Sequence, residues 1–136
     1  MDISTAAAVL AEQHHAVLAT MRGTGEPQLS PVVAAVDKQG RVLVSTRTHA
    51  YKVRNIRRDA RVFLCVLPDS FFGNWIQVDG RAEIIDLPDA MAGLKDTYRS
   101  IAGEHEDWAE FEASMRAEER VLLRIDILKA GPNRSG

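Results

Sequence analysis

Residues 76–84 read Ile-Gln-Val-Asp-Gly-Arg-Ala-Glu-Ile and decide the fold class, because apolar or small side chains alternate with polar ones. In an extended chain successive side chains point to opposite faces, so this period of two predicts a β-strand with one buried face. Gly80 stands in the middle of that face. A glycine inside a strand is typical of a bulge or a sharp bend, and we expect one there.

Other stretches before and after this strand are also expected to be extended. We expect strands over about 16–21, 28–36, 41–45, 62–67 and 121–127. Most connections are tight turns marked by Gly and Pro, and short connections favour antiparallel pairing. An antiparallel sheet of this size that closes makes a small barrel. The expected fold class is therefore mainly β (α+β), with six or seven antiparallel strands.

Two or three peripheral helices are expected around this barrel. Residues 2–13 predict a short helix that Asp2 or Ser4 can cap. The apolar spacing of residues 87–101 predicts an amphipathic helix that ends at Gly103, and residues 108–115 mark another helix face.

The 136 residues suit one domain, 1–136, with a frayed tail expected over 131–136. A hydrophobic fraction of 46% and a charged fraction of 26% argue against disorder. The net charge of −2 argues against binding nucleic acid over the whole surface, so we expect no nucleic-acid partner. The lone Cys65 excludes a disulfide framework and is expected to be a buried core thiol.

No run of about 18 apolar residues is present, and the N-terminus lacks the basic flank of a signal peptide. We therefore expect no membrane partner and a cytoplasmic location. Residues 32–36 and 62–67 are apolar at successive positions, so both faces of these strands need cover. Because one small barrel cannot cover both faces, we expect a second subunit to do so, in a homodimer.

Basic and acidic side chains gather in separate segments. Residues 47–61 hold six Lys and Arg and one acid, whereas residues 104–112 hold five acids and neither Lys nor Arg. Taken alone, this pattern describes two solvated faces that balance each other.

The local context of the basic segment favours an anion site. A strand ends in Ser45-Thr46-Arg47-Thr48, and a short helix over 49–58 follows, with Thr48 as its expected N-cap. Free N–H groups at a helix N-terminus bind anions, and Lys52 and Arg47 add positive charge. This composition is typical of a phosphate site. The glycine motifs of Walker and Rossmann sites are absent from the sequence.

Other groups of residues carry weaker signals. The side chains of His14 and His15 diverge on a helix or a strand, so a shared metal is not expected. The acidic loop over 103–107 is expected to cap the helix that starts at Trp108. The aromatic residues of 71–75 form either a satellite core cluster or a wall for ring stacking. No serine lies in a nucleophile motif, and we expect neither a catalytic side chain nor a metal ligand.

The order of several motifs resembles a known family. The runs are Ala-Val-Leu-Ala-Thr-Met at 16–21, Lys-Val-Arg-Asn-Ile-Arg-Arg-Asp at 52–59, Val-Asp-Gly-Arg-Ala at 78–82 and Ile-Ala-Gly-Glu-His-Glu-Asp-Trp at 101–108. Over about residues 8–130 the chain is similar to the split-β-barrel flavin/deazaflavin oxidoreductases, B branch, which are relatives of pyridoxamine-phosphate oxidase. The resemblance implies an FMN-binding type of split barrel and a homodimer with cofactor sites at the subunit interface.

The resemblance also implies a cofactor and its site. The cofactor is coenzyme F420, with FMN as the alternative, and Lys52 with the preceding turn would hold the phosphate. Asn74, Trp75 and Ile76 would close the site from the partner subunit. The full set of implied residues is Gln28, Ser30, Ser45, Thr46, Arg47, Ala50, Tyr51, Lys52, Val53, Arg54, Asn55, Asn74, Trp75 and Ile76. Some relatives carry Arg where Ala50 stands, and Arg47 is expected to replace that charge.

Three functions stay open at this point. The first is an F420-dependent reductase that transfers a hydride from reduced deazaflavin to a small conjugated organic acceptor, such as a quinone, an enone or the tetrapyrrole biliverdin. The second is an FMN-binding oxidoreductase of the same fold. The third is a protein that binds a cofactor or a tetrapyrrole without turnover.

Overall fold

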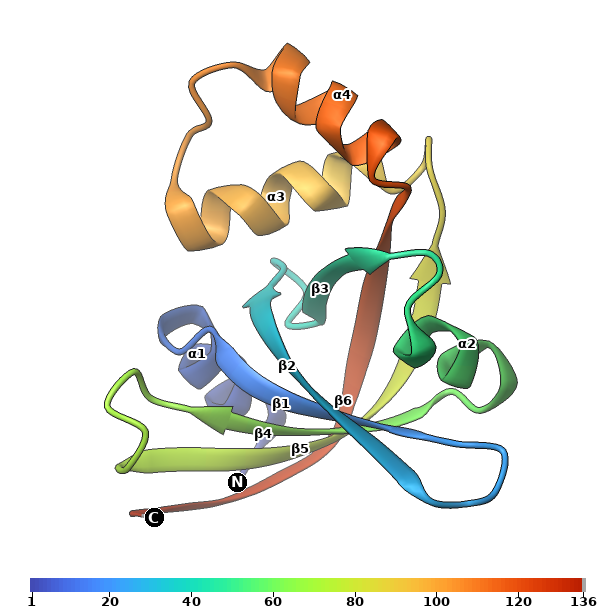
Figure 1. Cartoon of the computed structure of the whole chain (residues 1–136). Helices are drawn as coiled ribbons and strands as arrows, with labels where there is room; N and C mark the ends of the chain where they lie inside the picture. The colour runs from blue at the N-terminus through green and yellow to red at the C-terminus, as the bar shows by residue number, and fades with distance from the viewer. Residues whose placement is uncertain (136) are drawn as a thin grey trace.

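The computed structural model describes the backbone of residues 1–135 and the side chains of residues 1–132. The helices are α1 (Ile3–Glu12), α2 (Tyr51–Arg58), α3 (Met91–Ala102) and α4 (Trp108–Ala117). The strands are β1 (His15–Met21), β2 (Pro27–Val36), β3 (Val42–Arg47), β4 (Arg61–Leu67), β5 (Asn74–Ile85) and β6 (Arg120–Ser135). Figure 1 shows a twisted barrel of strands with α3 and α4 above it.

The six strands form one closed antiparallel barrel in the order β1-β2-β3-β6-β5-β4. This confirms the mainly β fold with a small antiparallel barrel. The stretch 76–84 is the centre of β5, where Ile76 and Val78 are buried and Gln77 is exposed. The pairing with β6 shifts register between Asp79 and Gly80, so the expected irregularity at Gly80 is also confirmed.

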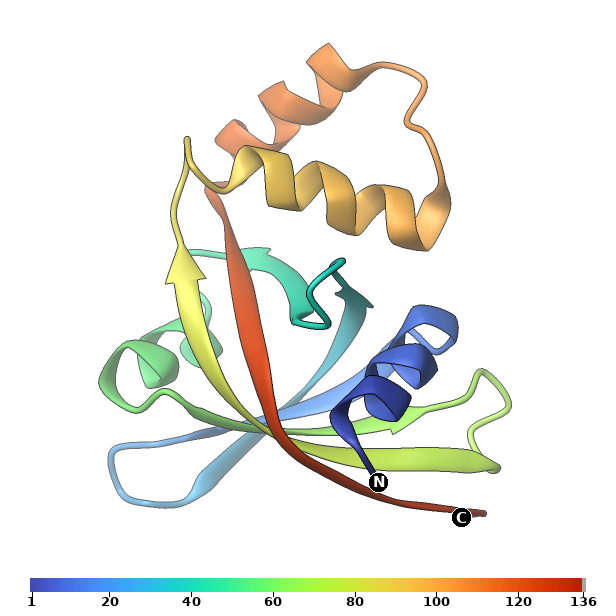
Figure 2. The same ribbon diagram turned by 180° about the vertical axis from the view of Figure 1, so that it is seen from behind.

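Two helices close the barrel core from opposite sides, as Figures 1 and 2 show. Leu10 of α1 and Val53 of α2 belong to the same buried cluster as the inward-facing side chains of the strands. A second, smaller core lies outside the barrel, where Leu94 of α3 and Phe111 of α4 pack near Leu122 of β6. The described residues hold four helices: the three expected at 2–13, 87–101 and 108–115, and the short helix expected over 49–58, which is α2.

The helix ends follow local chemistry. The carboxylate of Asp2 accepts a hydrogen bond from Thr5 N at 2.8 Å and caps α1, as expected. Gly103 ends α3 with a φ of 82°, which suits glycine, and the Asp107 carboxylate caps α4. The prediction of Thr48 as the cap of α2 is wrong: the N-cap is Ala50, which has no side-chain hydrogen-bond acceptor to offer.

The barrel is split between β2 and β3. These strands pair over three residues, from Ala34↔Val44 to Val36↔Val42. Beyond that point, the first half of β2 pairs with β1 alone, and the last half of β3 pairs with β6 alone. The two strands diverge, and the gap between them opens toward α2 (Figure 1).

Three local predictions need correction. Strand β6 continues to Ser135 and pairs with β5, so a frayed tail is wrong for 131–135, while Gly136 lies outside the described residues. Cys65 is half-buried on the outer face of β4 rather than in the core, and burial raises the pKa of its thiol. Phe71 and Phe72 are 59% and 67% exposed, so they form no satellite core.

No helix within residues 1–135 is long and apolar enough to span a membrane.

Candidate functional site

A pocket of about 550 Å³ occupies the gap between β2 and β3. One part of its wall is apolar and comes from β1, β2 and the end of β4. The other part is polar and comes from β3, α2, α3 and the start of β6. The lining residues are His15, Ala16, Val17, Pro31, Val32, Val33, Ser45, Thr46, Lys52, Leu67, Thr97, Ile101 and Arg120.

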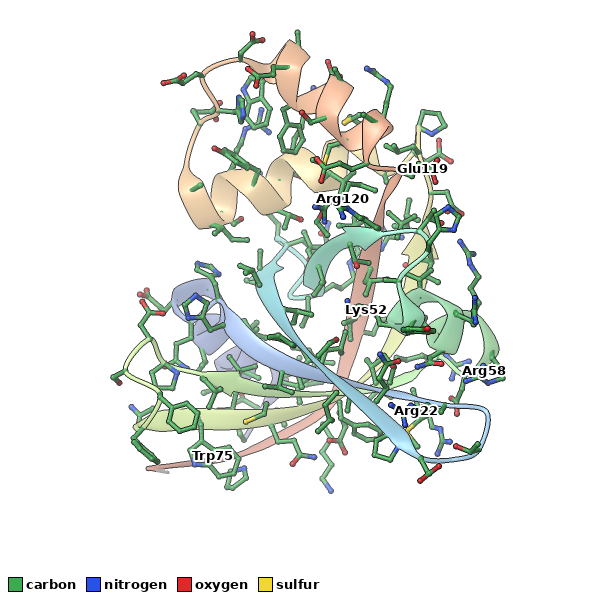
Figure 3. All side chains as sticks on the ribbon, viewed as in Figure 1. Arg22, Lys52, Arg58, Trp75, Glu119 and Arg120 are labelled. Carbon is green, nitrogen blue, oxygen red and sulfur yellow. The ribbon has the colours of Figure 1, made fainter. Side chains whose placement is uncertain are left out.

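The fold places two cationic side chains at this pocket, Lys52 and Arg120, which Figure 3 labels. The Lys52 side chain is half-buried, and burial together with the nearby charge of Arg120 lowers the pKa of its ammonium group. No carboxylate among the described side chains lies within ion-pair distance of Lys52. A partly desolvated cation of this kind gains most from an anionic ligand.

Unlike Lys52, Arg47 and Arg120 are both paired with a carboxylate, that of Glu118. Arg120 donates to Glu118 Oε1 at 2.8 Å, and Arg47 donates to the same oxygen at 3.3 Å. The hydrogen bond from Arg120 lowers the pKa of Glu118, which therefore stays ionised between them. Arg47 is exposed and does not line the pocket, so the expectation that it replaces a charge at position 50 has no support from its position.

The turn that leads into α2 is held in place by the start of β6. Thr48 N donates to Glu119 O at 2.9 Å, and His49 Nε2 lies 2.8 Å from Glu119 Oε2. Because Ala50 caps α2 without a side-chain acceptor, the N–H groups of Tyr51 and Lys52 have no hydrogen-bond acceptor among the described residues. These two N–H groups remain available to a ligand at the positive end of the helix.

Asn55 faces the interior from α2 and joins it to two strands. Its side chain is 6% exposed, and Nδ2 donates to Thr20 Oγ1 at 3.0 Å and to Gln28 Oε1 at 2.8 Å. The pair Asn55 and Gln28 therefore spans the gap between α2 and β2. Ser30 lies half-buried between Gln28 and the pocket residue Val32 on the same face of β2.

The other residues of α2 that were predicted to bind the cofactor do not line the Lys52 pocket. Ala50, Val53 and Arg54 line a smaller cavity of about 320 Å³ beside α2. Val53 is otherwise part of the barrel core. Tyr51 is exposed, with the Arg54 guanidinium 5.7 Å from its ring centre.

The three residues assigned to a partner subunit lie at the start of β5. Figure 3 shows Trp75 at the end of the barrel far from Lys52. Asn74 is exposed, and its carbonyl accepts from Gln13 Nε2 at 3.0 Å. Ile76 is fully buried in the barrel core, so its side chain has no surface to offer a ligand. Within one chain these residues do not join the Lys52 pocket.

Several pocket residues escaped the sequence reasoning. Arg120 and Thr97 are 68 and 45 positions from Lys52 in the chain, and no local pattern connects them with it. The apolar wall of Val17, Pro31 and Leu67 looked like ordinary strand sequence. Because β1 and β4 are apolar at nearly every position, no alternation in their sequence indicates which side chains face outward.

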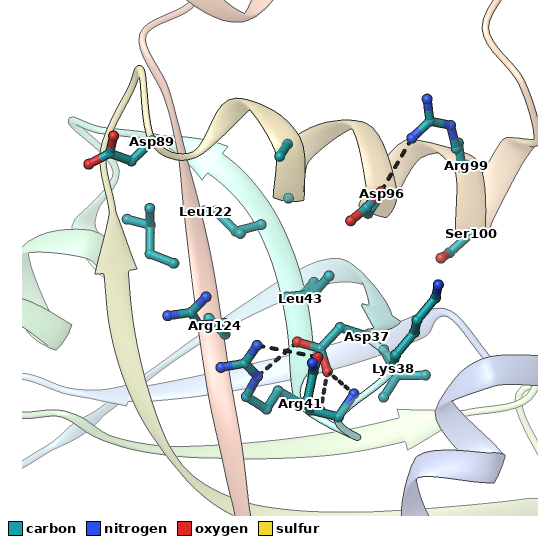
Figure 4. Close-up of a pocket in the computed structure, with 15 residues that line it drawn as sticks. Asp37, Lys38, Arg41, Leu43, Asp89, Asp96, Arg99, Ser100, Leu122 and Arg124 are labelled. Carbon is teal, nitrogen blue, oxygen red and sulfur yellow. Dashed lines mark hydrogen bonds and ion pairs between the residues drawn. The ribbon is translucent and has the colours of Figure 1, made fainter.

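A second cavity, of about 540 Å³, lies between α3, the turn after β2 and strand β6 (Figure 4). Three arginines line it, and each is ion-paired. Arg41 lies 2.8 Å from Asp37, Arg99 lies 3.3 Å from Asp96, and Arg124 lies 2.7 Å from Glu83. These arginine charges are already neutralised, and Lys38, which also lines the cavity, is exposed, so the half-buried Lys52 is the stronger candidate to hold an anionic ligand.

Several solved structures have a similar fold, and their names indicate different functions. A conserved hypothetical protein from Mycobacterium tuberculosis matches with a TM-score of 0.78 and 23% identity, over 96% of this chain and 82% of that one. An F420 reductase matches with a TM-score of 0.70 and 22% identity, over 91% and 94%. A pyridoxamine 5'-phosphate oxidase-related, FMN-binding protein from Nostoc punctiforme matches with a TM-score of 0.63 and 15% identity, over 93% and 80%.

At these identities the structures establish the fold alone. The family model named pyridoxamine 5'-phosphate oxidase matches residues 4–132, which include all six strands up to Pro132 and the Lys52 pocket. The chain belongs to the pyridoxamine 5'-phosphate oxidase family, as a split-barrel member of the kind that its sequence motifs predicted.

Proposed function

We propose that this protein is a flavin-type oxidoreductase that uses coenzyme F420 and transfers a hydride to a small conjugated acceptor such as a quinone, an enone or a tetrapyrrole like biliverdin. The observation that carries the proposal is the half-buried, unneutralised Lys52 in the gap between β2 and β3. An F420 reductase among the structures of similar fold supports the choice of cofactor.

The residues around the pocket fit such a cofactor. Its phosphate would meet Lys52, the two N–H groups that begin α2 and the hydroxyls of Ser45 and Thr46. Its ring would meet the apolar wall that includes Val17, Pro31 and Leu67. One charged end and one apolar wall are what an amphipathic ring with a phosphate chain requires.

In this mechanism the protein binds and orients, and the bound deazaflavin would supply the hydride-donating carbon. Lys52 neutralises the phosphate and fixes one end of the cofactor. The apolar wall excludes water from the ring. His15 lines the pocket, and its Nδ1 lies 3.3 Å from Asp69 Oδ1, but a proton from solvent would also serve. No obligatory acid, base or nucleophile is assigned to the chain.

We also propose that the protein works as a homodimer, because the pocket opens onto an apolar outer face. Cross-strand rows on β2, β1 and β4 build this face: Val33, His15 and Leu67; Pro31, Val17 and Cys65; Leu29, Ala19 and Phe63. Leu29 is 64% exposed and Val33 is 45% exposed. A contiguous exposed apolar patch of this kind is typical of a protein interface.

FMN is the second candidate cofactor, favoured by the FMN-binding protein of the same fold. FMN carries a phosphate and a ring of similar shape, so the same pocket features fit it. Binding of a cofactor or a tetrapyrrole without turnover is the remaining alternative.

Titration of the purified protein with F420 and with FMN, followed by absorbance and fluorescence, tests the proposal. We expect tighter binding of F420 and oxidation of the reduced form when a quinone or biliverdin is added. Tighter binding of FMN would show that the cofactor is FMN and would favour the FMN-binding oxidoreductase instead. Binding of either without turnover of any acceptor would favour the carrier function.

A further inference from the structure

The C-terminal half of α3 borders the Lys52 pocket through Thr97 and Ile101. These residues are four positions apart, so they lie on one face of the helix. Thr97 is 4% exposed, and its hydroxyl donates to Gly93 O at 2.7 Å. Because that bond uses the only hydrogen of the hydroxyl, Thr97 has no donor left for a ligand. The side chains that α3 brings to the pocket therefore offer neither a charge nor a hydrogen-bond donor.

The side chain of Ile101 is available to a ligand. Leu94 and Tyr98 of α3 pack in the second core, whereas Ile101 is 38% exposed and joins neither core among the described residues. An exposed apolar side chain alone needs no explanation, but this one lines a pocket. Ile101 is also the first residue of the run 101–108, which the proposed function does not use.

A second apolar surface borders the same pocket, on β1, β2 and β4. It includes Val17, Pro31 and Leu67, and the proposed function places the cofactor ring against it. Helix α3 packs against β2 and β3, and Figure 1 shows α3 above β3 and β1 below it. The pocket therefore has two apolar surfaces, one on the strands and one at Ile101.

The geometry of hydride transfer decides what can lie between these two surfaces. The acceptor must lie against a face of the cofactor ring, with the reacting atoms about 3–3.5 Å apart. With the strands against one face of the ring, only the other face is open to the acceptor. That face is turned away from the strands, so the acceptor would lie between the ring and α3.

We propose that Ile101 is a specificity-determining residue that contacts the acceptor, and that the acceptor turns an apolar planar ring, such as that of a substituted quinone, toward α3. This inference rests on the proposed function. In this arrangement the acceptor separates Ile101 from the cofactor, so a change at Ile101 acts on the acceptor and leaves cofactor affinity unchanged. Removing apolar surface at Ile101 weakens acceptor binding in proportion to the area lost.

The contact is tested first without turnover, in protein loaded with oxidised F420 or FMN, which cannot reduce a quinone. In methyl NMR of labelled isoleucines, the quinone menadione should shift the δ1-methyl signal of Ile101, and the oxidised cofactor alone should shift it little. The signal is identified by its loss in Ile101→Val. Ile3 on α1 is 47% exposed and does not line the pocket, so its methyl is the control. A large shift with the cofactor alone, or none with menadione, would overturn the inference.

Steady-state kinetics test the specificity with a matched pair of variants. Val and Thr have nearly the same shape, so Ile101→Val and Ile101→Thr differ by a methyl group and a hydroxyl. Ile101→Thr should have a KM for menadione at least about threefold above that of Ile101→Val, with kcat and cofactor Kd within about twofold. Leu128→Thr is the control, because Leu128 is 63% exposed on β6 and does not line the pocket.

The outcomes separate the inference from the proposed function. Equal KM values for the two Ile101 variants, with wild-type turnover intact, overturn the acceptor contact alone. A weaker cofactor Kd, or a change of mass in light scattering, in Ile101→Thr would show that Ile101 faces the cofactor or a second subunit instead. Reduction of biliverdin but not of menadione by the wild type would overturn the acceptor class. A wild type that binds neither cofactor, or reduces no acceptor, overturns the proposed function and the acceptor contact with it.

Discussion

Lys52 and Arg120 reach the same pocket from α2 and from the first residue of β6, and both carry positive charge. Arg120 shares its charge with Glu118 at 2.8 Å, whereas Lys52 lies beside no described carboxylate. Burial and the like charge of Arg120 both lower the pKa of Lys52. The fold therefore holds the charged Lys52 side chain where burial and a like charge disfavour it, and an anionic ligand would offset both effects.

Lys52→Ala should weaken binding of F420 by about tenfold or more, because a charge-assisted contact to phosphate contributes about 1.5–3 kcal/mol. Fluorescence titration at moderate salt measures the change. Arg54→Ala, on the far side of α2, is the control and should have a smaller effect. An unchanged Kd in Lys52→Ala would remove the phosphate site from this pocket.

Cofactor affinity should fall as pH rises, and the fall should begin at a lower pH than for an ordinary lysine, because burial and the charge of Arg120 lower the pKa of Lys52. The pKa of Lys52 is lowered, so Lys52 loses its positive charge at a lower pH than an ordinary lysine. Because the pKa of Lys52 is lowered in the folded protein, its charged form reduces the free energy of unfolding. This penalty disappears as pH rises through the lowered pKa and Lys52 loses its proton. Lys52→Met should thus remove the high-pH loss of affinity without lowering the Tm of the cofactor-free protein. The same loss of affinity at high pH in the wild type and in Lys52→Met would contradict this assignment.

The local pattern of the sequence predicts much of this fold and part of the site. Alternation over 76–84 identifies β5, and the hydroxyl-rich turn before Lys52 indicates an anion site. The split between β2 and β3 depends instead on where their pairing stops, at Ala34↔Val44, which no local pattern encodes. The side chain of Asn55 joins α2 to Thr20 of β1 and Gln28 of β2, which lie 35 and 27 positions earlier in the sequence. Residues 131–135 include Gly131 and Pro132 and show no alternation of apolar and polar residues, so their sequence does not predict a strand. They are part of β6 because they pair with β5.

Gly80→Ala should destabilise the barrel by about 1–3 kcal/mol, the usual cost of forcing extra volume into a packed site. A Cβ at Gly80 would lie 2.9 Å from the carbonyl oxygen of Asp126 and would also press on Ile125, so backbone must move. Urea unfolding measures the loss. Gly23→Ala is the matched control, because a Cβ there meets the flexible end of Arg58 at an ordinary 3.5 Å. Equal stability of the two variants would show that β5 and β6 can separate at the bulge without cost.

Leu29→Lys should shift the protein from dimer to monomer. Leu29 is 64% exposed in the single chain, so the substitution leaves the core intact but places a charge on the proposed interface. Leu128→Lys is the control, because Leu128 is 63% exposed on β6, outside the rows of β2, β1 and β4. Light scattering at micromolar concentration gives the mass. A wild-type protein that is monomeric under these conditions would refute the dimer.

Replacing any one of His14, His15, His49, His105 or Cys65 by Ala or Gln should lower kcat less than about tenfold. These are the side chains whose ordinary pKa lies nearest neutral pH, so they are the candidates for donating a proton after hydride transfer. His15 is the most demanding case, because it alone of the five lines the Lys52 pocket within the described residues. Where general acid help exists it contributes about 10²–10⁴-fold, well above the predicted effect. Chelators should leave turnover unchanged. The assay is reduction of a quinone or tetrapyrrole with saturating reduced deazaflavin. A thousandfold fall of kcat in His15→Gln, with cofactor affinity and Tm unchanged, would show that the chain itself supplies a proton donor.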